Sequence, residues 1–110
     1  VDIIVFYSNA GITDWNITDA KNFVQANAKV PSVTSVDFVA PYVLLGLTKV
    51  PDEQGQYAAE TARHIIDGTK PADIPVTTNK KGNIYINLPI ANKLGIEFTP
   101  DTLRNAIVVD

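Results

Sequence analysis

Short apolar runs alternate with amphipathic stretches along this chain, and their order predicts an α/β fold. The run at 2–7 is apolar and β-branched, which is typical of a strand buried on both faces of a parallel sheet. Residues 14–29 carry apolar side chains at helical spacing, and Pro31 ends that helix. Segments 32–36 and 42–50 follow as a second and a third strand.

A long helix is predicted to begin at Pro51, whose missing N–H costs nothing in a first turn, and to stop at Gly68. Its apolar positions form one face that we expect to be buried: Tyr57, Ala58, Ala62, Ile65 and Ile66. The remaining predicted elements are strands at 76–78 and 84–88, short helices at 89–94 and 101–105, and a closing strand at 106–109. The predicted order is β-α-β-β-α-β-β-α-α-β, within a single domain of 110 residues.

The amino-acid composition excludes several classes of function for this chain. Hydrophobic residues make up 45% and charged residues 19%, as in ordinary globular domains. The net charge of −3, with Lys and Arg scattered, argues against nucleic-acid binding. The chain has no cysteine, which excludes disulfides, thiolate nucleophiles and cysteine-based metal centres. No apolar run approaches the roughly 20 residues of a membrane span. No signal peptide is visible, and the chain starts at Val1 without Met, so we interpret it as a fragment.

Nothing in the sequence predicts a metal ion or a cofactor. His64 is the only histidine, and Glu60 lies on the same side of the predicted helix. A metal site needs more ligands than this pair, so we interpret it as a solvated helical pair. Neither a P-loop nor a G-x-G-x-x-G motif occurs.

The sequence also predicts that the protein is not an enzyme. No G-x-S-x-G elbow is present, and Ser8 has no convincing base beside it. A small α/β hydrolase remains an alternative that would need a catalytic partner beside Ser8 or Asp37. A response regulator would need an acidic pair and a phospho-acceptor aspartate after its strands, and the strand ends do not supply this trio.

Polar and aromatic residues follow two of the predicted strands. In open α/β sheets, ligands bind beyond the carboxyl ends of the strands. A few hydrogen-bonding groups with an aromatic ring are the usual lining of a small-solute pocket. The candidate ligand-binding residues are therefore Tyr7, Ser8, Asn9, Asp37 and Phe38. Ordinary turn residues would produce the same pattern, so both interpretations stay open.

A more specific signal is the order of motifs between Gly46 and Gly95. The stretch contains Gln54-Gly55, an alanine-rich helix ending Ile65-Ile66-Asp67-Gly68, Pro71-Ala-Asp-Ile-Pro75, Asn83-Ile-Tyr-Ile-Asn87 and Lys93-Leu94-Gly95. This order resembles the C-terminal portion of the substrate-binding proteins of an ABC importer family. The resemblance implies a type I periplasmic-binding-protein fold and small solutes such as aromatic or branched amino acids. The chain would be the later part of one three-layer lobe, with a return segment at about 76–110.

The resemblance also implies roles and partners. Ser8 and Asn9 would hydrogen-bond the solute, Asp37 would accept from an ammonium or hydroxyl group, and Phe38 or Tyr7 would cover the apolar part. Two lobes would close on the solute and dock on a membrane permease, so the expected location is extracytoplasmic, periplasmic or lipid-anchored at the cell surface. Complete members are much longer, and a fragment with unpaired sheet edges is a candidate homodimer. A ligand-sensing module of the same fold in a signalling protein is the alternative.

Overall fold

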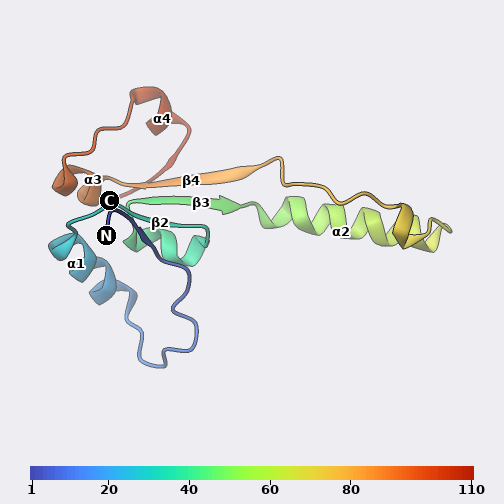
Figure 1. The fold of residues 1–110 in the computed structure, drawn as a ribbon, viewed down its shortest axis with the longest axis horizontal. Coiled ribbons are helices and arrows are strands. Elements are labelled where there is room, and N and C mark those ends of the chain that lie inside the picture. The colour runs from blue at the N-terminus through green and yellow to red at the C-terminus, as the bar shows by residue number, and fades with distance from the viewer. The chain divides into compact units, whose positions relative to one another are not determined.

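A computed structural model describes residues 1–110 and shows a sheet with helices in its connections (Figure 1). The sheet has five strands in the order β1-β2-β3-β4-β5. The elements in chain order are β1 (Ile4–Val5), α1 (Ile17–Asn27), β2 (Ser32–Thr34), a 3₁₀ helix (Asp37–Tyr42), β3 (Leu45–Lys49), α2 (Pro51–Ile66), a second 3₁₀ helix (Pro71–Asp73), β4 (Gly82–Asn87), α3 (Leu88–Leu94), α4 (Pro100–Arg104) and β5 (Ile107–Val109). This arrangement confirms the predicted α/β class.

Most of the sheet is parallel. β1 pairs with β2, β2 with β3, and β4 with β5, each in parallel. β3 and β4 run in opposite directions, because the N–H of Asn87 donates to the carbonyl of Leu44 while Tyr85 lies against Gly46, farther along β3. The chain therefore leaves the sheet along β3 and returns along its neighbour β4.

Contacts divide the chain into two compact units. The first comprises Val1–Thr48 and Asn83–Asp110, and the second comprises Lys49–Gly82. The first unit holds the buried core, in which the 3₁₀ helix Asp37–Tyr42 and helix α3 supply most of the fully buried side chains. The buried hydrophobic residues are Val39, Ala40, Tyr42, Val43, Leu44, Ile86, Ile90 and Ala91. That residues 1–110 form a single domain, the later part of one lobe with a return segment at about 76–110, stays a prediction.

Local chemistry explains where the helices begin. The side chain of Asn16 accepts hydrogen bonds from the N–H groups of Thr18 and Asp19, so α1 starts at Ile17 and not at the predicted residue 14. Pro51 opens α2 as predicted. Asn87 caps α3, and Gly95, with φ of +67°, ends it in a left-handed conformation.

Two predicted strands differ from the structure. β1 covers two residues, and it lies at the edge of the sheet with Val5 69% exposed, so the expectation of a strand buried on both faces is wrong. Residues 76–78 form no strand, because no neighbouring strand pairs with them and Val76 is fully exposed.

The predicted buried face of α2 is also wrong for this chain. No residue of α2 is buried, and Ile66 is 83% exposed. Within Lys49–Gly82 the helix is accompanied only by the segment that follows it, which is too little chain to cover an apolar stripe. No helix of the structure is both long enough and apolar enough to span a bilayer.

Candidate functional site

The candidate site lies at the ends of β1 and β2. Because these strands are parallel neighbours, their carboxyl ends meet at the same edge of the sheet. The loop after β1 carries Tyr7, Ser8 and Asn9, and the 3₁₀ helix after β2 begins with Asp37 and Phe38. The fold thus brings the two predicted groups of residues to one edge.

Asn9 is tied to the chain that follows β2. The hydroxyl of Tyr42 donates to Oδ1 of Asn9 over 3.2 Å. Tyr42 is 2% exposed, and burial raises its pKa above the ordinary value, so the phenol stays neutral and keeps the proton that it donates. This bond fixes the amide oxygen of Asn9.

Ser8 and Asp37 each accept a hydrogen bond within their own loop, whereas Tyr7 and Phe38 are exposed. Oγ of Ser8 accepts from the N–H of Ala10 at 3.0 Å, and Oδ1 of Asp37 accepts from the N–H of Phe38 at 2.8 Å. The rings of Tyr7 and Phe38 are 71% and 51% exposed. One carboxylate oxygen of Asp37 and both rings therefore remain available to a ligand, although these four side chains make no hydrogen bond to one another.

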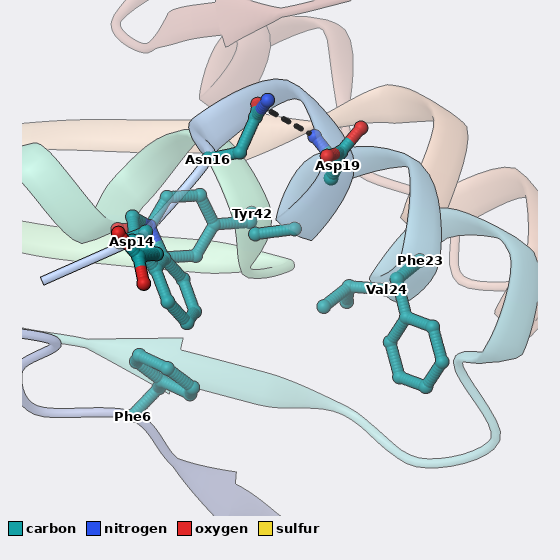
Figure 2. A pocket seen from close by; sticks show the side chains of 9 residues that line it. Phe6, Asp14, Asn16, Asp19, Phe23, Val24 and Tyr42 are labelled. Atoms are coloured by element: carbon teal, nitrogen blue, oxygen red, sulfur yellow. Dashed lines mark hydrogen bonds between the residues drawn. The ribbon is translucent and has the colours of Figure 1, made fainter. Parts of the chain in front are cut away.

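A hollow of about 550 Å³ lies beside this edge. Its size falls within the range of small-molecule sites. Figure 2 shows Phe6 and Tyr42 on one side of it and Phe23 and Val24 on the other. The lining residues are Phe6, Asp14, Trp15, Asn16, Asp19, Ala20, Phe23, Val24 and Tyr42. None of the five predicted residues is among them, but Tyr42 connects the hollow to Asn9.

An aromatic cluster forms one wall of the hollow, and sequence reasoning did not identify it. The ring centroids of Phe6 and Tyr42 lie 5.8 Å apart at 80°, an edge-to-face contact, and those of Trp15 and Tyr42 lie 5.7 Å apart. The available signal was that Trp15 is the only tryptophan. Its contact with Tyr42 joins residues far apart in the sequence, so spacing could not reveal it.

The structure contains no group of three or more His, Cys, Asp or Glu side chains that could hold a metal ion. His64 and Glu60 both lie on exposed positions of α2. The side chains at the strand ends offer an amide, a carboxylate, hydroxyl groups and aromatic rings.

Comparison with known families gives a match over nearly the whole chain. The model described as ABC transporter substrate binding protein matches residues 4–109. This match confirms the resemblance predicted from the motifs between Gly46 and Gly95. A comparison with curated proteins gave no match.

Two solved structures are similar to this chain. One is the ABC domain in complex with L-Trp from Streptococcus pneumonia, with 27% identity and a TM-score of 0.55, over 73% of this chain and 28% of that one. The other is a conserved domain protein from Vibrio cholerae O1 biovar El Tor, with 19% identity and a TM-score of 0.62, over 99% of this chain and 36% of that one. The Vibrio cholerae structure, at 19% identity, supports the assignment of the fold alone. The chain spans 28% and 36% of the length of these two proteins.

Proposed function

We propose that this chain, which belongs to the ABC transporter substrate binding protein family, is part of the solute receptor of an ABC importer. The observation that carries the proposal is the meeting of two polar loops at the carboxyl ends of β1 and β2, where open α/β sheets bind ligands. The bond from Tyr42 to Asn9 supports it, because it orients an amide at that edge. The role is binding, and no catalytic residue is proposed.

The proposed solute is a small molecule such as an amino acid. Asp37 would accept hydrogen bonds from its ammonium group, and Ser8 and Asn9 would bond its other polar groups. Phe38 and Tyr7 would cover its apolar part, because their rings are exposed at the strand ends. The similar Streptococcus structure, which holds L-Trp, supports this class of solute.

The proposed partner is a membrane permease, and the proposed location is outside the cytoplasm. Both rest on family membership. Closure of two lobes around the solute would create the surface that docks on the permease, as in other hinge-closing receptors.

The test is the double variant Asn9→Ala, Asp37→Ala in the protein at its natural full length. Calorimetric titration with a panel of amino acids should show at least a tenfold loss of affinity for the bound solute, about 1.4 kcal/mol. The matched control is Asn22→Ala, Asp52→Ala, which removes the same two residue types from exposed helical positions. Equal affinities in wild type and the Asn9/Asp37 variant would remove both residues from the site.

A further inference from the structure

Tyr42 is a core residue whose hydroxyl group reaches the loop after β1. Its side chain is almost fully buried, and its ring packs against the rings of Phe6 and Trp15 at the wall of the hollow (Figure 2). The hydroxyl contacts Oδ1 of Asn9, a half-buried residue of that loop. A tightly packed group of the core thus contacts one polar residue of the proposed site.

The backbone around Tyr42 is anchored as well. Tyr42 is the last residue of the 3₁₀ helix Asp37–Tyr42. Nδ2 of Asn87 donates to the carbonyl of Pro41 and so attaches this end of the helix to the junction of β4 and α3. The position of the Tyr42 hydroxyl is therefore set by the core and not by the loop that it contacts.

The surroundings of the hydroxyl favour one direction for this hydrogen bond. The indole nitrogen of Trp15 is buried, and an indole N–H can only donate. Burial raises the pKa of Tyr42, and the Trp15 N–H acts against burial by lowering this pKa, although its geometry falls short of a hydrogen bond. With a donor on that side, the phenol proton is directed to Oδ1 of Asn9. A reversed amide would leave this buried proton without an acceptor, which is costly.

The other polar atom of the Asn9 amide remains at the surface. Nδ2 makes no hydrogen bond within the chain, and it is not among the buried polar atoms that lack a partner. An amide nitrogen donates and does not accept. The bond from Tyr42 therefore determines which end of the amide is available to another molecule.

The same short helix carries a second polar group of the proposed site. Asp37 begins the helix that Tyr42 ends. The carboxylate of Asp37 is an acceptor, whereas the available atom of the Asn9 amide is a donor. One element of six residues thus supplies the acceptor directly and sets the donor through its last side chain.

We propose that Tyr42 is a positioning residue that makes Asn9 present its amide N–H groups to the solute. The site then recognises a hydrogen-bond acceptor of the solute at Asn9 and an ammonium group at Asp37. A solute with an ammonium group and a carboxylate satisfies both, whereas a simple amine satisfies Asp37 alone. The selection of the solute rests on the proposed function, but the orientation of the amide does not.

The first experiment needs no solute and uses the 110-residue chain with Tyr42→Phe, which keeps the ring and removes the hydroxyl. NMR relaxation should show the order parameter of the Asn9 side-chain nitrogen falling below about 0.6, the range of flexible groups. The backbone of β1 should keep its order. The control is Tyr85→Phe, because Tyr85 is half-buried in β4 and its hydroxyl makes no hydrogen bond. An equally ordered Asn9 side chain in Tyr42→Phe and wild type would overturn the positioning role.

The second experiment tests the selection of the solute in the protein at its natural full length. Calorimetric titration compares L-tryptophan with tryptamine and L-leucine with isopentylamine, because each amine lacks the carboxylate of its amino acid. In Tyr42→Phe the affinity for the amino acid should fall about fivefold, the effect of one hydrogen bond, and that for the amine by less than about twofold. Equal losses for both members of a pair would overturn the selection by Asn9.

A double-mutant cycle separates positioning from packing. If Tyr42 acts through Asn9, Tyr42→Phe should cause no further loss of amino-acid affinity in an Asn9→Ala background. Additive losses would show that Tyr42 acts by another route and would overturn the proposal. If the wild type binds neither member of either pair, the proposed function fails for this class of solute. The first experiment still decides the positioning role in that case.

Discussion

At Gly46, in the middle strand of the sheet, there is no room for a side chain. A Cβ atom built on this residue would lie 3.1 Å from Cβ of Ala40 and 3.2 Å from Cβ of Tyr85. Both neighbours are attached directly to backbone, so neither yields by rotating. The reason for a glycine at this position is the close approach of β3 to two other elements.

Gly46→Ala should therefore lower the free energy of unfolding by about 1–3 kcal/mol, the usual cost of overpacking. The matched control is Gly55→Ala, inside α2, where a Cβ meets nothing within 4 Å. That change should be neutral or stabilise by up to about 1 kcal/mol, because alanine favours a helix over glycine. Urea unfolding monitored by circular dichroism measures both, and equal effects of the two changes would contradict the packing argument.

At the scale of elements, one residue joins strand to helix. Asn87 is 1% exposed and lies where β4 ends and α3 begins. Its Oδ1 accepts from the N–H of Ile90 at 3.1 Å, and its Nδ2 donates to the carbonyl of Pro41 at 2.9 Å. One side chain thus caps α3 and attaches it to the 3₁₀ helix that precedes β3.

Asn87→Ala should destabilise the protein by about 2–4 kcal/mol, since it removes a helix cap and leaves a carbonyl without its partner. Asn92→Ala is the control, because Asn92 lies on the exposed side of the same helix and its side chain makes no hydrogen bond. Thermal unfolding of the two variants tests the difference. A decrease in melting temperature of the same size in both variants would mean that the buried contacts of Asn87 contribute little to stability.

At the scale of the whole molecule, strand β1 forms an open edge of the sheet. The N–H groups of Ile4 and Phe6 donate to carbonyls of the β2 side, so the backbone groups of Val5 between them point away from β2. β1 is an edge strand with exposed apolar side chains, and such edges pair readily with other strands.

We expect the 110-residue chain to form a dimer at micromolar concentration through this edge. Native mass spectrometry measures the oligomeric state and reports any bound solute in the same spectrum. Val5→Lys should return the mass to that of a monomer, because it places a charge on the edge without removing a bond to β2. A monomeric wild-type chain would contradict the expectation.

Local signals in the sequence were sufficient to predict much of the fold. Asn16 and Pro51 start helices and Gly95 ends one through contacts or conformations within a few residues, so their helices were predicted to within a few positions. The resemblance to ABC transporter substrate binding proteins also followed from the sequence, because it depends on the order of motifs along the chain.

The sequence by itself thus determined the fold class, the family and the approximate ends of the helices, because these follow from the order of motifs along the chain and from contacts within a few residues. Only the tertiary structure decided burial and side-chain partners. Tyr42 and Asn9 are 33 residues apart, and Glu53 and Lys80 are 27 apart. Whether an apolar face is covered depends on what packs against it, and this is why α2, amphipathic in sequence, has no buried residue in this chain. Contacts of this kind form only when the chain folds back on itself, so no local pattern can encode them.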